Sequence, residues 1–262
     1  MKDIQLNKLD ASQRKLLQYG VILILVLFLG IYFFVNWKDT SLVGNNEVYL
    51  EDSKLQVFND SYIFTGYPDR ILVHYPYFLL IQANKPLTTI YNLETKQKEK
   101  EVNDILLDYY DGHIVYNRKE TYFNDKSLGE YCDAAFIKES DEILCITKQS
   151  RNFVDNRLIS INPETPNLWK RIYQSDNLLT TVSVINNDLY VGEINFETKQ
   201  NYVAVNEQVT PVETTVNMIY EMGEKPYFAS FKSELNDNAQ SYYLIENGQV
   251  RKQEGNRIYF FK

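Results

Sequence analysis

The stretch DILLDYYDGHIVY, from Asp104 to Tyr116, contains two short apolar runs on either side of Asp111-Gly112. An Asp-Gly pair is typical of a two-residue turn between antiparallel strands, because both residues tolerate positive φ angles. Leu, Ile, Val and Tyr suit the pleated, half-buried surface of a strand. The stretch therefore predicts a β-hairpin centred on Asp111-Gly112.

Hairpins of the same type recur along the chain. Four further apolar runs turn into a second run: RILVHYP into YFLLIQ, AAFIKESD into EILCIT, TTVSVINND into LYVGEI, and VNMIYEMGEKP into YFASF. With the first hairpin, their centres fall near residues 76, 112, 140, 187 and 224, at a mean spacing of about 37 residues. We find no convincing helix after residue 46, so this part of the chain is predicted to be all-β.

The tetrapeptide Asn-x-Glu-Thr also occurs three times, beginning at Asn92, Asn162 and Asn195. The first two copies follow a predicted strand and precede another. We expect them to form the turn between outer strands, where the Asn and Thr side chains hydrogen-bond to local backbone groups. The third copy falls one strand early in its repeat.

The hairpin spacing and these turns resemble β-propeller repeats, which are about 40 residues long with several strands each. The resemblance reaches the superfamily only, since no Trp-Asp or Asp-box signature is present. It implies five complete blades and a sixth formed by GNRIYFFK at the C-terminal end with EVYL, KLQVF and SYIFTG between Glu47 and Gly66. Closure would remove the exposed strand edges. Another blade number, a sandwich and stacked open sheets are the alternatives.

A transmembrane helix is predicted over residues 16–37, because Tyr19 to Val35 contains no charged residue and the flanks extend it to about 20 residues. Tyr19, Tyr32 and Trp37 would lie at the membrane interfaces. The positive charges before the span place residues 1–15, a short tail, in the cytoplasm. Residues 38–46 would be a linker and residues 47–262 an ectodomain. A cleaved signal peptide and a buried core helix are the competing interpretations.

The ectodomain would then be periplasmic or extracellular, at a bacterial cytoplasmic membrane. Cys132 and Cys145 flank a polar turn in such an oxidising compartment, so a disulfide and two buried thiols are both open. The formal net charge of −8 opposes nucleic-acid binding, which needs clustered Lys and Arg.

No catalytic, cofactor-binding or metal-binding motif is found. The chain has two histidines, His74 and His113, and both fall in predicted strands beside aromatic residues, where structural roles are common. The many carboxylates leave any choice of a catalytic pair arbitrary. Trp169 could anchor a partner, or pack between blades as part of an outer strand.

These observations predict a non-catalytic scaffold or docking subunit of a cell-envelope complex, with protein partners and a lipid bilayer around its helix, and with no cofactor. The alternative is a membrane-tethered carbohydrate-active enzyme or sugar-binding protein that uses carboxylates at the centre of the ring.

Overall fold

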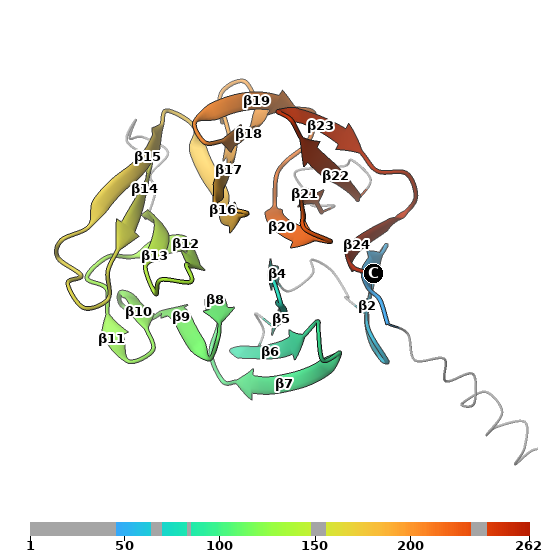
Figure 1. The fold of residues 1–262 in the computed structure, drawn as a ribbon, viewed down its shortest axis with the longest axis horizontal. Coiled ribbons are helices and arrows are strands. Elements are labelled where there is room, and N and C mark those ends of the chain that lie inside the picture. Colours follow the sequence, from blue (N-terminus) through green and yellow to red (C-terminus); the bar gives the residue numbers. More distant parts are fainter. Residues whose placement is uncertain (1–45, 64–69, 83–84, 148–155, 232–239) are drawn as a thin grey trace, which may run out of the picture. The chain divides into compact units, whose positions relative to one another are not determined.

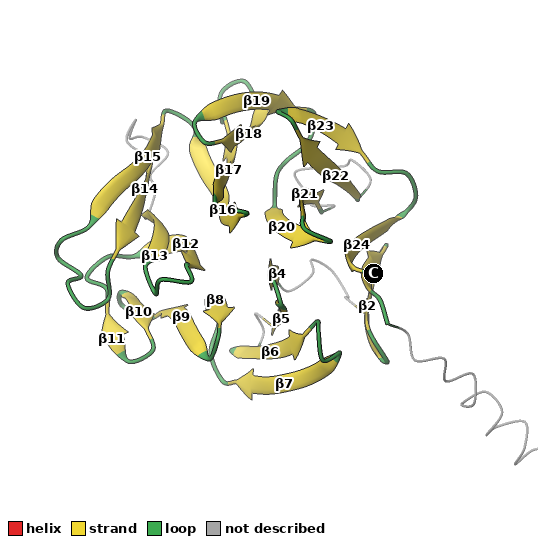
Figure 2. Cartoon of the chain, viewed as in Figure 1, coloured by secondary structure: helices red, strands yellow, loops and turns green. Residues whose placement is uncertain are grey.

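The computed structural model describes residues 46–63, 70–82, 85–147, 156–231 and 240–262. The predicted tail and transmembrane helix, with Tyr19, Tyr32 and Trp37, and the predicted linker as far as residue 45 lie outside these ranges. Among the described residues, no helix has both the length and the apolar character needed to cross a bilayer. Strands and connecting loops make up the described part of the chain (Figure 2).

The strands form six four-stranded antiparallel sheets in the described residues, and we call the sheets blades I to VI. Blade I comprises β4 (Ile71–His74), β5 (Tyr77–Gln82), β6 (Leu87–Asn92) and β7 (Gln97–Val102). Blade II comprises β8 (Leu106–Tyr110), β9 (His113–Asn117), β10 (Thr121–Phe123) and β11 (Lys126–Ser127). Blade III comprises β12 (Cys132–Ile137), β13 (Ile143–Thr147), β14 (Asn156–Ile161) and β15 (Lys170–Ser175).

Blade IV comprises β16 (Leu178–Ile185), β17 (Asp188–Ile194), β18 (Asn201–Val205) and β19 (Gln208–Val212). Blade V comprises β20 (Met218–Met222), β21 (Lys225–Ser230), β22 (Ser241–Glu246) and β23 (Gln249–Lys252). Blade VI has the order β24-β1-β2-β3, with β24 (Arg257–Phe261), β1 (Val48–Glu51), β2 (Lys54–Val57) and β3 (Asp60–Ile63).

Blade VI joins the two ends of the described chain. Strand β24 pairs antiparallel with β1, and Leu50 lies opposite Ile258. Glu51 lies opposite Arg257, and their side chains form an ion pair of 3.1 Å. The six blades surround a common centre (Figure 1), so the predicted six-bladed β-propeller with terminal strand closure is confirmed.

The predicted hairpins are the first and second strands of blades I to V. Their turns lie at Tyr75–Pro76, Asp111–Gly112, Lys138–Glu142, Asn186–Asn187 and Gly223–Glu224. In an antiparallel blade, the turn after the first strand and the turn after the third strand lie at the same edge. We call the side of the ring that carries both sets of turns the pocket face.

The Asn-x-Glu-Thr turns use the chemistry that the sequence indicates. Asn92 is the last residue of β6, before the turn to β7, and its Oδ1 accepts hydrogen bonds from the backbone N–H groups of Glu94 and Thr95, both at 3.0 Å. Asn195 makes the same pair of bonds between β17 and β18, which are the second and third strands. The third copy therefore does lie one strand early, on the opposite face from the first.

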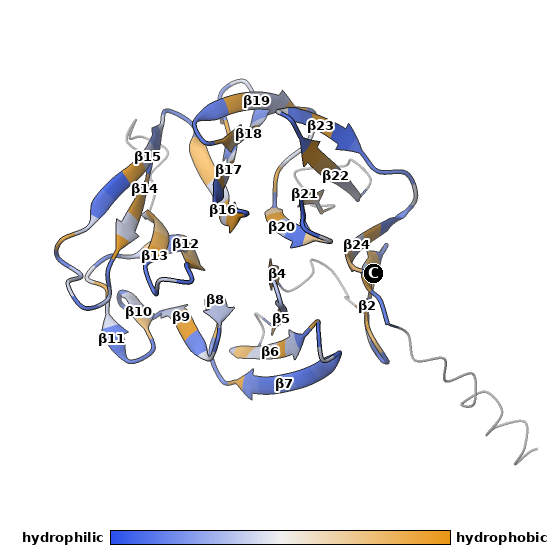
Figure 3. Cartoon of the chain, viewed as in Figure 1, coloured by the Kyte–Doolittle hydropathy of each residue, from blue (hydrophilic) through white to orange (hydrophobic). Residues whose placement is uncertain are grey.

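The core lies between adjacent blades and is built from the inner three strands. Strands β5, β6, β13 and β14 are largely buried, whereas the outer strand β7 is largely exposed. Figure 3 shows the same contrast, with hydrophilic outer strands β7 and β23. The charged run in β7 keeps this edge soluble and hinders pairing with another chain.

Candidate functional site

A cavity of about 480 Å³ lies at the centre of the ring on the pocket face. Its lining comes from the innermost strands and first turns of blades I to V. The residues that carry its chemistry are His74, Tyr75, Tyr110, Phe136, Glu139 and Glu221. We call this cavity the central pocket.

His74 is the most buried titratable residue in the pocket wall, at 9% exposed. Its Nδ1 lies 2.9 Å from Oδ2 of Asp108, which also accepts a hydrogen bond of 2.6 Å from the backbone N–H of Ile137. A carboxylate can only accept, so Nδ1 of His74 carries the proton in this bond. In this tautomer of the neutral ring, Nε2 is the acceptor nitrogen.

Aromatic rings hold the imidazole in place. The His74 ring stacks on Tyr110 at a centroid distance of 4.5 Å and on Phe136 at 4.1 Å. These three side chains come from blades I, II and III, and the dyad with Asp108 forms where blade I packs against blade II. The structural role expected for His74 fits this packing. Nothing in the sequence around His74 indicates that the residue also lines a cavity.

Acidic side chains line the other part of the pocket. Glu221, in β20, is half-buried, and burial raises the pKa of its carboxyl above the usual value. Nearby Glu224 adds to this rise, while His74 opposes it. Glu139 is exposed at the turn of blade III. Lys138 also lines the pocket, and its Nζ forms a 2.6 Å ion pair with Glu142.

Arg70 lies just before β4, and burial lowers the pKa of its guanidinium. The negative charges of Asp108 and Asp133 oppose that decrease.

The described residues contain no group of three or more His, Cys, Asp or Glu side chains that could hold a metal ion. Among these residues, the pocket therefore offers acceptors and aromatic surface, without a metal site.

His113 lies outside the pocket. Its Nδ1 is 3.0 Å from Nδ2 of Asn124, and its ring stacks on Phe123 at 5.2 Å. Its Nε2 lies 3.8 Å from the Asp141 carboxylate of the next blade. These contacts give His113 a position between blades II and III, as expected for a structural histidine.

Trp169 lies in the loop between β14 and β15, directly before the outer strand rather than within it. It is 37% exposed, and the guanidinium carbon of Arg157 lies 5.1 Å from the centre of its ring. The preceding residue, Leu168, is 77% exposed. Because the turn after the third strand lies on the pocket face, Trp169 lies on that face, with part of its surface covered by Arg157. Its role as an interaction aromatic stays a prediction.

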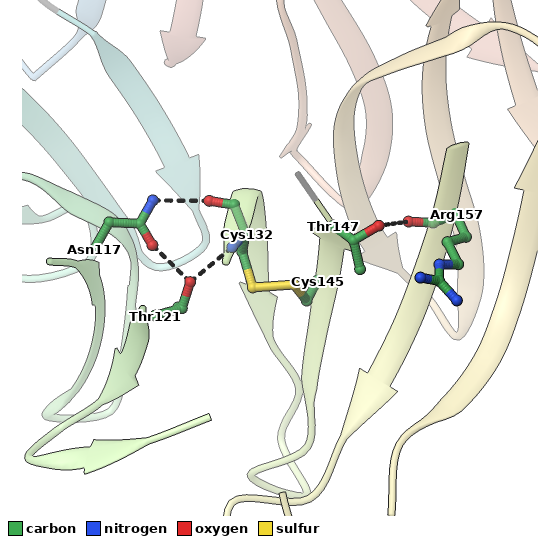
Figure 4. The surroundings of a disulfide bond; sticks show 6 residues. All are labelled: Asn117, Thr121, Cys132, Cys145, Thr147 and Arg157. Atoms are coloured by element: carbon green, nitrogen blue, oxygen red, sulfur yellow. Dashed lines mark hydrogen bonds between the residues drawn. A yellow bond between two sulfur atoms is a disulfide. The ribbon is translucent and has the colours of Figure 1, made fainter. Parts of the chain in front are cut away.

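Cys132 and Cys145 form a disulfide between β12 and β13 (Figure 4). A bulge shifts the register between residues 132 and 134, so Cys132 lies opposite Thr147 while Cys145 lies opposite Ala135. Thr121 of blade II accepts a hydrogen bond from the Cys132 backbone N–H at 2.7 Å. The bridge therefore lies beside the contact between blades II and III.

No protein-family model and no curated protein matches the sequence. Solved structures match at low similarity: the dihydro-heme d1 dehydrogenase NirN at 10% identity and TM-score 0.40, over 80% of this chain and 53% of that one. Hsv2 from Kluyveromyces marxianus matches at 11% identity and a TM-score of 0.38, over 80% of this chain and 76% of that one. A putative exported protein from Bacteroides fragilis matches at 10% identity and a TM-score of 0.37, over 72% of this chain and 80% of that one.

The chain spans about half the length of the NirN chain. Likeness at these TM-scores carries no information about function. The architecture follows from strand order and register, which are those of a six-bladed β-propeller closed by its terminal strands.

Proposed function

We propose that this chain is a single-pass, membrane-anchored and non-catalytic docking subunit of a cell-envelope complex. The propeller presents the partner-binding surface, and the predicted helix at residues 16–37 holds it at the bacterial cytoplasmic membrane. The observation that carries this proposal is the exposed apolar pair Leu168 and Trp169 on the pocket face. Large exposed apolar side chains on a rigid scaffold are typical anchors of protein interfaces.

The disulfide supports a location outside the cytoplasm. Bridges persist in oxidising compartments and are rare in the reducing cytoplasm. Cys132 and Cys145 are both fully buried within blade III, at 0% exposed. Their pairing fits a domain that matures in the periplasm or outside the cell, with the N-terminus in the cytoplasm.

Site-specific photo-crosslinking in intact membranes tests the docking surface. A benzophenone amino acid at Leu168 should yield one discrete adduct with a membrane or envelope protein. Phe196, 38% exposed in the β17–β18 loop on the opposite face, is the matched control position and should yield none. Trp169→Ala should reduce the adduct from position 168. Recovery of the uncrosslinked chain alone from both positions would refute the docking role.

Protease accessibility tests the orientation separately. Proteinase K added to spheroplasts should digest the propeller, whereas the propeller in right-side-out vesicles treated with a quenched protease should stay intact. Digestion restricted to inverted vesicles would place the propeller in the cytoplasm and refute this part of the proposal.

A second candidate, a carbohydrate-active enzyme or sugar-binding protein, is favoured by one observation. Glu139 and Glu221 line the central pocket together with the aromatic residues Tyr75, Tyr110 and Phe136. Glycosidases use two carboxylates, and sugars stack on aromatic walls. Glu139→Gln and Glu221→Gln should each abolish sugar binding or turnover under this candidate, and should leave the crosslink from position 168 unchanged.

A further inference from the structure

The central pocket contains two carboxylates that form no ion pair with a lysine or arginine of the described residues. Glu139 and Glu221 have no ion pair among the described residues, and the one lysine in the lining, Lys138, is already paired with Glu142 at 2.6 Å. Glu224 lies close enough to Glu221 to raise the pKa of its carboxyl. The two glutamates of the lining outnumber its one lysine, so this partly desolvated space favours a cationic ligand and opposes an anionic one.

His74 adds a fixed acceptor to the same space. Because Asp108 holds the proton on Nδ1, Nε2 is the nitrogen that carries the acceptor lone pair when the ring is neutral. The hydrogen bond of the His74 side chain to Asp108 is made through Nδ1, and the side chain is nine-tenths buried and lines the pocket. Asp108 is itself held by the backbone N–H of Ile137, so the acceptor has a fixed direction.

The pocket walls provide apolar and π surface beside these acceptors. Tyr110 and Phe136 stack on His74 and both line the cavity, with Tyr75, which is 36% exposed, at the first turn of blade I. The faces of aromatic rings attract cations and also pack against methylene groups. A ligand that combines a positive charge with an aliphatic stem would use both properties.

We propose that the central pocket binds a primary ammonium group on an aliphatic chain, as in a lysine side chain. An ammonium carries three N–H donors and no acceptor. The pocket offers Nε2 of His74 and the carboxylates of Glu139 and Glu221 as acceptors for these donors. A volume of about 480 Å³ accommodates the aliphatic stem as well as the charged group. This binding is independent of the docking surface at Leu168 and Trp169.

Calorimetric titration of the full-length protein in lipid nanodiscs tests the proposal. The probe is Nα-acetyl-lysine amide, and its Nε-acetylated form, which lacks the charge, is the matched control ligand. We expect saturable one-to-one binding of the first and none of the second. Glucosamine and N-acetylglucosamine form a second arm, which distinguishes an amino sugar from a protein side chain as the source of the ammonium group.

Protein variants locate the site. Glu221→Gln and Glu139→Gln should each weaken the lysine probe about tenfold, since each removes a charge-assisted hydrogen bond. Glu254→Gln removes the same charge from an exposed loop between β23 and β24 and should leave affinity unchanged. Both pocket substitutions lie at the surface or half-buried, so the variants should fold, and thermal unfolding of each checks this.

The relative affinities of the lysine probe and glucosamine distinguish the two ligand classes. Tighter binding of the lysine probe than of glucosamine supports the proposal. Tighter binding of glucosamine would overturn the aliphatic chain as the ligand in favour of an amino sugar. Absence of saturable binding by either amine would overturn the proposal, as would equal binding of the acetylated probes or unchanged affinity in both glutamine variants. None of these results depends on the crosslink from position 168, so the two proposals fail independently.

Discussion

Phe260 connects three blades at the point where the ring closes, and its replacement by alanine should destabilise the whole propeller. The residue lies in β24 and is 0% exposed. Its ring centre is 5.6 Å from that of Phe78 in blade I and 5.5 Å from that of Tyr220 in blade V. Truncating a fully buried phenylalanine to alanine costs about 3–5 kcal/mol, because the removed ring leaves a cavity.

A loss of that size lowers the melting temperature by roughly 10 °C in a domain of this length. Thermal unfolding of the full-length protein, followed by circular dichroism near 215 nm, measures the shift. Phe196→Ala is the matched control, since the same ring is removed from a side chain that is 38% exposed. We expect the control to move the midpoint by less than about 2 °C. Equal shifts in the two variants would refute the closure of the ring through β24.

Three further predictions concern the disulfide, the pocket and the turns. Reduction of Cys132–Cys145, which are 13 residues apart, should cost about 3 kcal/mol and lower the melting temperature by roughly 6–12 °C; an unchanged midpoint in dithiothreitol would contradict the bridge. Because burial raises the folded pKa of the Glu221 carboxyl, its ionised form opposes folding as the pH rises through that pKa. Glu221→Gln should therefore raise the melting temperature at pH 7, with a gain that shrinks below about pH 4, and a gain independent of pH would argue against this cause. Asn92→Ala removes the acceptor for two backbone N–H groups and should cost about 1 kcal/mol in chemical denaturation, against no measurable loss for the exposed Asn103→Ala.

The hairpins and the ring closure could be predicted because their signals are local. Asp111-Gly112 and Asn186-Asn187 form turns at positive φ angles, which these residue types tolerate. Five hairpins at a mean spacing of about 37 residues leave unpaired strands at both ends, and pairing of these strands is the remaining way to remove the edges. The bond pattern of Asn92 likewise involves groups within three residues in sequence.

The central pocket could not be predicted because it depends on contacts between blades. His74 and Asp108 are 34 residues apart, and their pairing requires blades I and II to meet at a defined angle. Nothing in the residues around Glu221 or Glu139 distinguishes them from the many other carboxylates of the chain. Trp169 was expected within an outer strand, but β15 begins one residue later, which leaves the indole in an exposed loop.

Disulfide trapping between the two ends of the propeller tests the closed ring most directly. Glu51 and Arg257 are cross-strand neighbours in β1 and β24, and their ion pair measures 3.1 Å. In the variant Glu51→Cys/Arg257→Cys, mild oxidation should link peptides containing residues 51 and 257 within one chain, as detected by mass spectrometry. The variant Glu51→Cys/Lys252→Cys, whose second position lies in β23 of blade V, should remain unlinked. Absence of the 51–257 link, or links between two chains only, would contradict a propeller closed by its own terminal strands.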